Sequence, residues 1–296
     1  EGDLSRRDFT VNAMALRVPE LEFVDPFGGA NDLAKGVLRT PVDPRQSFDD
    51  DPLRMMRAVR FVAQLGFRIE PETAEALSDM VDRIEIVSAE RVRDELVKLL
   101  LSDRPRAGIE ALVDSGLADI VLPEIPALQL EIDEHHRHKD VFEHTMIVIE
   151  RAVALETGPD GPVPAPDLTL RLAALLHDIG KPLTKAYDPQ VGWTFHSHEV
   201  VGSKMVPGIF RQLKLPLNEH MKFVRKMVFL HLRPIILSED MVTDSAVRRL
   251  LFEAGDDVEK LMTLCEADIT SGIDAKVKRY LQNFELVRRK MKDLEE

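Results

Sequence analysis

The stretch Leu172-Ala173-Ala174-Leu175-Leu176-His177-Asp178-Ile179-Gly180-Lys181 decides the fold of the second half of this chain. Its five leading apolar residues predict a buried helix. The His177-Asp178 pair at the end of that helix can bind one divalent metal ion through a ring nitrogen and a carboxylate oxygen. Gly180 permits a tight turn, and Lys181 can place a fixed positive charge near a phosphate group. The stretch therefore predicts a metal site on a helical core.

Further candidate metal ligands lie at wide intervals on both sides of this pair. Each stands on or beside a predicted helix, next to apolar residues that would give a metal site rigid support. The candidate ligands are His144, His177, Asp178, His198, His231 and Asp268. Four imidazoles and two carboxylates suit Mn, Fe, Ni, Co, Zn or Mg better than a thiolate site would.

The roles of these residues differ. His177, Asp178 and Lys181 are the candidate catalytic residues. His198 and His231 remain open as substrate contacts if the site holds one metal only, and any single histidine can instead be a core or capping residue. The other histidines are expected on the surface or in linkers: His135, His136, His138, His196 and His220.

Composition limits the class of protein. A chain of 296 residues is long enough for two domains of roughly 150 residues each. No apolar run approaches the ~20 residues of a membrane span, and no signal peptide is evident. The single cysteine, Cys265, excludes an internal disulfide and suits a reducing cytoplasm, where we expect the protein. The net charge of −13 argues against nucleic-acid binding by the whole surface but leaves room for a local basic face.

Hydrophobic periodicity predicts a mainly α protein with a short α/β segment at its N-terminus. Residues 9–16 look helical, and 21–25 alternate like a strand whose partner could be 37–39. A hairpin or lid is expected within 183–196. Further helices are expected over 52–65, 71–82, 88–101, 105–115, 140–156, 167–178, 197–213, 218–232, 243–254, 256–271 and 274–295.

Two arginine-rich segments indicate nucleotide binding. In Arg6-Arg7-Asp8, followed by Asn12, the guanidiniums can hold a triphosphate while the acid and the amide bind ribose hydroxyls. On a helix start Asp8 and Asn12 would share one face. The alternative is an Arg–Asp surface pair that caps a helix.

The second segment is a predicted helix that begins after Asp51-Pro52. Arg54, Arg57 and Arg60 recur every third residue, and Asp51 with Arg54 would present the acceptor and donor that recognition of a base edge requires. The alternative is a solvated basic stripe. The candidate nucleotide-binding residues are thus Arg6, Arg7, Asp8, Asn12, Asp51, Arg54, Arg57 and Arg60.

The histidine and aspartate series resembles the HD superfamily of metal-dependent phosphohydrolases. The matching motif is His144, His177-Asp178 and Asp268, and His198 and His231 match the extra ligands of members that hold two metals. The resemblance implies an all-helical domain over about 135–275 and hydrolysis of phosphate esters by a metal-activated water.

Residues 1–130 resemble the class II transfer RNA nucleotidyltransferases, which include bacterial CCA-adding enzymes and their poly(A) polymerase relatives. Arg6-Arg7-Asp8 with Asn12 matches the family's ribose and triphosphate motif, and 32–39 resemble its hinge. Residues 50–54 match its Glu-Asp-x-x-Arg motif with Asp50 in place of Glu, so that Asp51 and Arg54 would pair with CTP or ATP. Residues 90–100 match a helix that braces this template.

This resemblance implies an order of domains. We expect a remnant of the nucleotidyltransferase head at 1–45, a helical neck for nucleotide selection and RNA binding at 46–130, an HD domain at 131–275, and a helix at 276–296 that leads to a body or tail. The family's Gly-Gly loop and paired aspartates lie upstream of Arg6 and do not occur here, so we expect an N-terminally truncated chain that lacks polymerisation chemistry.

The implied partners are tRNA, CTP and ATP, with no membrane; nothing indicates the oligomeric state. The implied cofactors are Mg for nucleotidyl transfer and Mn, Ni, Co, Fe or Mg in the HD site. One alternative is a stand-alone HD phosphohydrolase, a nucleotide phosphatase or 2′,3′-cyclic phosphodiesterase, although it leaves residues 1–110 without a role. A poly(A) polymerase shares the same motifs. A noncatalytic RNA-binding module is disfavoured because the ligand set is complete.

Overall fold

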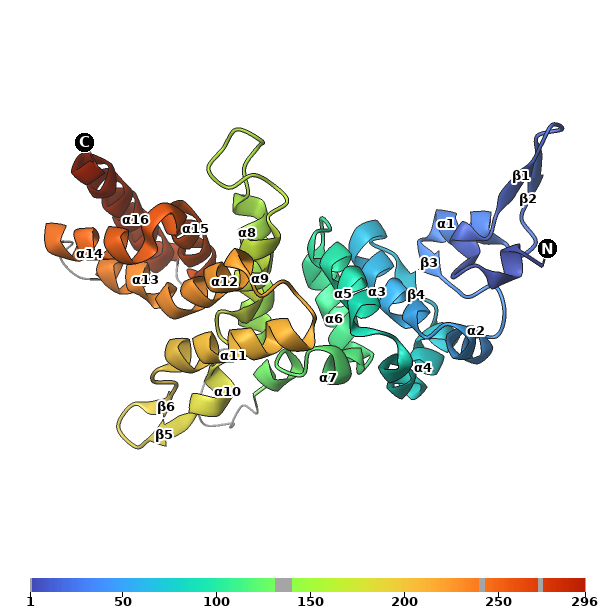
Figure 1. Cartoon of the computed structure of the whole chain (residues 1–296), viewed down its shortest axis with the longest axis horizontal. Helices are drawn as coiled ribbons and strands as arrows, with labels where there is room; N and C mark the ends of the chain where they lie inside the picture. The colour runs from blue at the N-terminus through green and yellow to red at the C-terminus, as the bar shows by residue number, and fades with distance from the viewer. Residues whose placement is uncertain (1, 131–139, 240–242, 271–273, 296) are drawn as a thin grey trace. The chain divides into compact units, whose positions relative to one another are not determined.

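The computed structural model describes residues 2–130, 140–239, 243–270 and 274–295. The chain divides into two compact units, Glu1–Pro126 and Ala127–Glu296, and each is described by itself (Figure 1). Helices predominate in both units, which confirms the mainly α fold class with a short α/β segment at the N-terminus. Within the described residues, no helix is long and apolar enough to cross a membrane.

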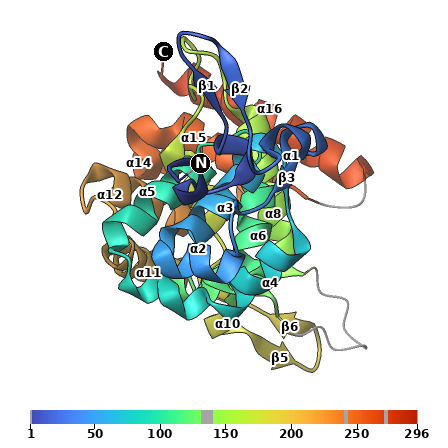
Figure 2. The same cartoon turned by 90° about the vertical axis from the view of Figure 1, so that its right-hand side faces the viewer.

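The first unit opens with short elements. Two 3₁₀ turns, η1 (Leu4–Arg6) and η2 (Thr10–Asn12), precede an antiparallel hairpin of β1 (Ala15–Arg17) and β2 (Glu22–Val24), which extends away from the helices of its unit (Figures 1 and 2). Next come α1 (Gly29–Lys35) and β3 (Val37–Leu38), and β3 pairs in parallel with β4 (Arg68–Ile69).

Two expectations for this segment are wrong. Residues 9–16 form a turn and a strand because Thr10 is drawn into tertiary hydrogen bonds: its amide donates to the Arg39 carbonyl (2.8 Å) and its hydroxyl to Asp32 (2.7 Å). The partner of β2 is β1, and residues 37–39 pair elsewhere. Local alternation identifies a strand but does not select its partner.

The remaining elements of the first unit are helical. The helix α3 packs against α5 and α6, and Gly108 permits this approach, since a Cβ there would lie 2.7 Å from both Ala63 Cβ and Leu99 Cγ. Gly66 ends α3 with a φ of 69°, as its position predicted. The elements are α2 (Pro44–Asp50), α3 (Leu53–Leu65), α4 (Pro71–Asp79), η3 (Val81–Ile86), α5 (Ala89–Leu100), α6 (Pro105–Asp114) and α7 (Leu117–Val121), and the turn η4 (Pro126–Leu128) begins at the last residue of this unit and continues into the second.

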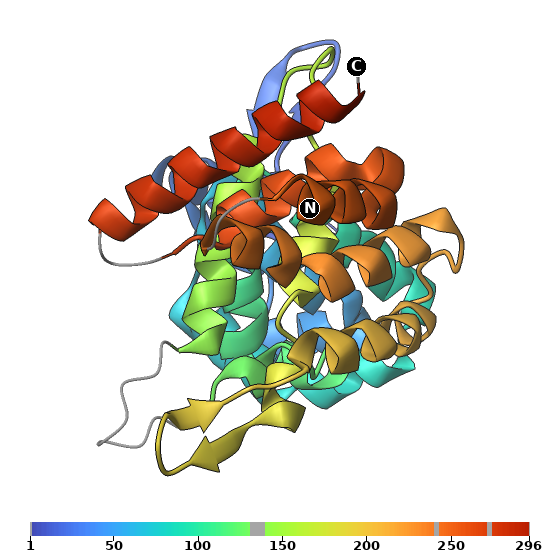
Figure 3. The ribbon, with the colours of Figure 1, turned by 90° about the vertical axis from the view of Figure 1, so that its left-hand side faces the viewer.

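The second unit is a helical bundle with one small hairpin (Figure 3). The expected helices and the expected hairpin, here β5 and β6, are confirmed, and the structure adds the short helices α10 and α13. The elements are α8 (Val141–Leu155), α9 (Leu168–Leu176), α10 (Lys181–Thr184), β5 (Ala186–Asp188), β6 (Gly192–Thr194), α11 (His198–Gln212), α12 (Glu219–Leu230), α13 (Leu232–Glu239), α14 (Asp244–Ala254), η5 (Gly255–Asp257), α15 (Val258–Asp268) and α16 (Asp274–Glu295).

The helix α9 is the centre of this bundle. It packs against α8, α12 and α15, and residues 170–176 are all buried. Burial of each leucine contributes about 1.5–3 kcal/mol. The Asp167 carboxylate caps its first turn by accepting hydrogen bonds from the Leu170 amide (3.0 Å) and the Thr169 hydroxyl (2.7 Å), and it pairs with Lys260 of α15 (2.6 Å). The C-terminal end of α9 is therefore held in a fixed position, and the His177-Asp178 pair follows there.

Candidate metal centre and nucleotide-selection helix

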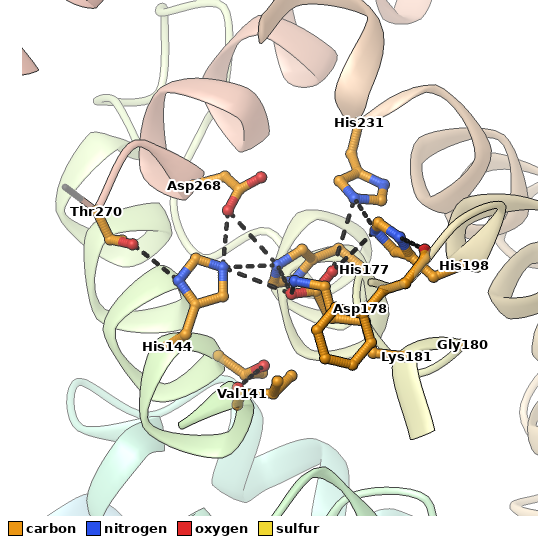
Figure 4. Close-up of polar contacts among 12 residues, drawn as sticks. Val141, His144, His177, Asp178, Gly180, Lys181, His198, His231, Asp268 and Thr270 are labelled. Carbon is orange, nitrogen blue, oxygen red and sulfur yellow. Dashed lines mark hydrogen bonds and ion pairs between the residues drawn. The ribbon is translucent and has the colours of Figure 1, made fainter. Parts of the chain in front are cut away.

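The six predicted metal ligands converge from five places in the second unit (Figure 4). One lies in the first turn of α8, two directly follow α9, one begins α11, one follows α12 and one ends α15. In that order they are His144, His177, Asp178, His198, His231 and Asp268. Four of them are at least nine-tenths buried: His177, Asp178, His198 and His231.

The ligands form two groups of three, and within each group the candidate ligand atoms lie within 4.8 Å of one another. The groups are His144, His177 and Asp268, and Asp178, His198 and His231. Asp178 faces both groups. Its Oδ2 atom lies 3.3 Å from His177 Nε2, and its Oδ1 atom lies 3.2 Å from His198 Nε2. One carboxylate can therefore bridge two neighbouring cation positions.

Backbone carbonyls orient three of the four imidazoles. His177 donates its Nδ1–H to the Ala174 carbonyl (2.8 Å), His198 donates to the Phe195 carbonyl (2.8 Å), and His231 donates to the Val228 carbonyl (2.7 Å). A carbonyl oxygen only accepts, so Nδ1 carries a proton in each of these rings and Nε2 is the nitrogen that faces the centre, where it offers a lone pair to a metal ion whenever it is itself unprotonated. The Nδ1 atom of His144 lies 2.8 Å from the Thr270 hydroxyl, which can take either role.

This arrangement fits a cation. The Nε2 atoms of His198 and His231 lie 3.3 Å apart, and those of His144 and His177 are separated by the same distance. Two lone pairs at this distance repel unless a proton or a metal ion lies between them. With the nitrogen and oxygen donor set, the geometry matches a divalent ion of the borderline or hard class.

The charges around the centre also favour a bound cation. Burial by itself would raise the pKa of Asp268, but His144 and His177 hold it at about 2, and His177 and Lys181 hold the pKa of Asp178 well below its usual range. Burial would lower the pKa of His177, yet the two carboxylates raise it to about 9. Burial and the neighbouring His177 lower the pKa of His231 to about 4. The two buried carboxylates thus attract a positive charge, which a metal ion can supply in place of a proton.

Lys181 lies at the edge of this centre. Its Nζ atom is 2.6 Å from Asp178 Oδ2, and 21% of its side chain is exposed. It therefore has access both to a metal ligand and to solvent, while its contact with a phosphate group stays a prediction. Cys265 is fully buried, and burial raises the pKa of its thiol, which agrees with its expected role as core filler. His196 and His220 are exposed as expected; His135, His136 and His138 lie outside the described residues.

The three arginines of α3 do not form a solvated stripe. Arg57 Nη1 lies 2.7 Å from Asp8, and Arg54 Nε lies 3.4 Å from the same carboxylate. Arg60 Nε lies 2.5 Å from Glu95 on α5. Ion pairs thus connect α3 to Asp8 on one side and to Glu95 of α5 on the other.

Arg54 is the most enclosed of the three. Its Nη1 donates to the Ser47 carbonyl (3.1 Å) and hydroxyl (2.9 Å), and its Nη2 donates to the Arg6 carbonyl (2.6 Å). The Asp51 carboxylate instead accepts from the Leu53 amide (3.2 Å) and lies 3.6 Å from Arg91. Asp51 and Arg54 are therefore placed by different contacts.

Three of the candidate nucleotide-binding residues at the N-terminus are more exposed than Arg54. Arg6, Arg7 and Asn12 are exposed, and Arg7 lies 3.2 Å from Asp3. The expectation that Asp8 and Asn12 share a helix face is wrong because this segment forms two separate 3₁₀ turns.

Sequence reasoning missed Glu95 as a charge partner for these arginines. The signal for it is that Glu95 stands on the apolar face of its helix, between Val92, Leu96 and Leu99. Thr270 was also missed, and no local pattern distinguishes it.

Comparison with known families agrees with this geometry. Residues 141–272 match the HD domain, residues 66–128 match the probable RNA and SrmB-binding site of polymerase A, and residues 1–39 match the Poly A polymerase head domain. The six ligands thus lie within the stretch of the chain that matches the HD domain.

Curated relatives extend the similarity over most of the chain. The Deinococcus radiodurans A-adding tRNA nucleotidyltransferase is 39% identical over 274 residues, 90% of this chain and 59% of its own length. The Xanthomonas campestris pv. campestris Multifunctional CCA protein is 36% identical over 299 residues, 97% of this chain and 69% of its own length. The chain therefore belongs to the family of CCA-adding tRNA nucleotidyltransferases with an HD domain.

The chain spans 59% of the Deinococcus relative and 50% of the Multifunctional CCA protein of Neisseria gonorrhoeae. Among solved structures, the Bacillus stearothermophilus CCA-adding enzyme in complex with CTP has a TM-score of 0.64 at 24% identity, covering 99% of this chain and 59% of that one. The Thermotoga maritima CCA-adding enzyme complexed with tRNA has the same TM-score at 22% identity, covering 98% and 60%. These similarities establish the fold.

Proposed function

We propose that this chain is part of a cytoplasmic CCA-adding enzyme, which uses CTP and ATP to complete tRNA 3′ ends, and that its second unit hydrolyses phosphate esters. The substrates of the second unit are nucleotide phosphates or the 2′,3′-cyclic phosphates of RNA ends. The observation that carries the hydrolase half is the Asp178 carboxylate, whose two oxygens face two three-residue ligand groups. Family membership supports the nucleotidyltransferase half.

The six ligands would hold one or two divalent ions, with Asp178 shared between the positions. Mn, Ni, Co, Fe and Mg are the candidates for this centre, and Mg for nucleotidyl transfer. A bound divalent ion supplies a water of lowered pKa and neutralises charge on the phosphoryl group.

The protein's own groups prepare the centre. The carbonyls of Ala174, Phe195 and Val228 fix the imidazoles before any ligand binds, which removes a cost of reorganisation. Lys181 is placed to exchange its contact with Asp178 for a substrate oxygen, because its ammonium group is partly exposed beside the carboxylate.

The first unit would select the nucleotide. We assign triphosphate and ribose contacts to Arg6, Arg7, Asp8 and Asn12, and base contacts to Asp51 and Arg54, with Arg57 and Arg60 holding α3 in place through Asp8 and Glu95. A second candidate is an enzyme that adds only A, which the name of the Deinococcus relative favours. Calorimetric titration with CTP and ATP separates them, since an A-adding enzyme should bind ATP alone.

The hydrolase proposal is tested with Asp178→Asn, which keeps the shape of the side chain and removes its charge. Hydrolysis of a 2′,3′-cyclic nucleotide and of a nucleoside 3′-phosphate is measured with each candidate metal. We expect wild-type turnover with at least one metal, a loss of about 100-fold or more in the variant, and unchanged CTP and ATP binding. Full activity of the variant, or none in the wild type with any metal, would refute the proposal.

A further inference from the structure

A hollow of about 390 Å³ lies between α11 and α12, outside the metal centre. Four of its seven lining residues are basic and none is acidic, although the whole chain has a net charge of −13. The lining residues are Val200, Ser203, Lys204, Lys222, Arg225, Lys226 and Phe229. A concentrated positive surface on an acidic protein indicates an anionic ligand.

The four cations of the hollow differ in whether an acidic side chain balances their charge. Lys226 pairs with Asp257 (2.5 Å), and Lys222 forms an exposed pair with Glu219 (2.7 Å), which is worth little in water. Lys204 and Arg225 are exposed, and within the described residues neither forms an ion pair. These two side chains are free to bind phosphate.

The hollow adjoins the second ligand group. The helix α11 begins at His198, and His231 directly follows α12; their Nε2 atoms are 3.3 Å apart and the two helices pack against each other, so the chain leaves the centre along α11 and returns to it along α12. Val200 and Phe229 each lie two residues from one of these ligands. Lys204 is six residues beyond His198, about 9 Å along the helix at about 1.5 Å per residue. The basic surface therefore begins beside the centre and leads away from it.

We propose that this hollow binds the phosphates of a single RNA strand whose 3′ end lies at the metal centre. Lys204 and Arg225 would contact the phosphates nearest that end, and the ring of Phe229, which is 39% exposed, offers an apolar face to a base. A polymer is favoured over a small anion because the cations are spread along two helices. The role of the strand's end rests on the proposed hydrolase function, but strand binding does not.

The test is charge reversal of Lys204 and Arg225 to Glu in one variant of the full chain. The matched control carries Arg248→Glu and Lys292→Glu, which change the net charge equally on exposed positions of α14 and α16. Binding of a fluorescent single-stranded oligoribonucleotide is measured by anisotropy over a range of salt concentrations. Hydrolysis of a 2′,3′-cyclic mononucleotide is measured separately.

We expect the reversal variant to bind the oligoribonucleotide at least about 10-fold more weakly, with a salt slope smaller by about 1.4 for two lost phosphate contacts. The control should bind like the wild type, and mononucleotide hydrolysis should be the same in all three proteins. Equal binding by the reversal and control variants would overturn the proposal. A matching loss of mononucleotide hydrolysis would also overturn it, because the hollow would then serve a small anion. An inactive wild type that binds RNA through these residues would refute only the hydrolase proposal.

Discussion

Gly180 lies so close to His198 that a Cβ on the glycine would stand 2.1 Å from the His198 carbonyl oxygen. The backbone φ of Gly180 is −77°, so the close approach, and not an unusual conformation, requires glycine here. This contact joins the turn after Asp178 to the first residue of α11. It sets how near Asp178, which precedes the turn, can come to His198 in the second ligand group.

The first prediction follows from this contact. Gly180→Ala should push the start of α11 away, remove His198 from the second ligand group and lower the bound metal by about one ion per chain. Gly208→Ala, within the same helix and with no atom within 4 Å of the added Cβ, is the matched control and should stabilise the protein by up to about 1 kcal/mol. Metal content and thermal unfolding of both variants provide the measurement; a full metal load in Gly180→Ala would contradict this account.

The second prediction concerns the number of ions. His231→Gln removes a ligand from one group only, so we expect one of two ions to be lost or its affinity to fall by at least about 10- to 100-fold. The ion held by His144, His177 and Asp268 should remain. Titration with Mn or Ni followed by elemental analysis measures this, with His220→Gln, an exposed histidine, as control. Loss of both ions together would show that the groups are not independent.

The third prediction links pH to stability through Asp167. Burial would raise the pKa of this carboxyl, but Lys260, Thr169 and the Leu170 amide lower it overall. A lowered folded-state pKa stabilises the protein above the unfolded-state value of about 3.9, and this contribution is lost as the pH falls through the folded-state value. Wild-type stability should therefore fall in acid more steeply than that of Asp167→Asn.

At neutral pH, loss of the cap and of the lysine pair by Asp167→Ala should lower the free energy of unfolding by about 0.5–2 kcal/mol. Asp167→Asn keeps the capping bond to Leu170 and should cost less. Urea unfolding between pH 3 and 7 measures both effects. Parallel acid profiles for the wild type and Asp167→Asn would show that the carboxylate does not contribute.

The fourth prediction separates nucleotide selection from stability. Arg54→Ala leaves the Ser47 and Arg6 carbonyls without their donor and should lower the free energy of unfolding by about 1–3 kcal/mol, so its effect on selection is mixed with a folding defect. Asp51→Asn keeps the acceptor for the Leu53 amide and turns one carboxylate oxygen into a donor.

Asp51→Asn should therefore fold like the wild type and change the ratio of CTP to ATP affinity by about 10-fold, one hydrogen bond's worth of about 1.4 kcal/mol. Calorimetric titration with each nucleotide measures the ratio. An unchanged ratio would count against the assignment of base recognition to Asp51.

The sequence alone determined which residue types are available for the candidate sites. Apolar periodicity indicated most of the helices, and the spacing of His144, His177-Asp178 and Asp268 indicated the ligand set before any fold was known. These features are local or depend on residue type, so a single chain displays them directly. The family motifs are likewise short runs of residue types that can be recognised without the fold.

Only the tertiary structure decided how these groups meet. In the folded chain the two oxygens of Asp178 face different ligand groups, and Arg54 is enclosed between Ser47 and Arg6. The strand β3 pairs with β4 across 29 intervening residues. Each of these contacts joins residues that packing brings together, and their energy depends on distances and burial that no local pattern encodes. The ligand types are therefore a property of the sequence, whereas the arrangement of two facing groups is a property of the folded helices.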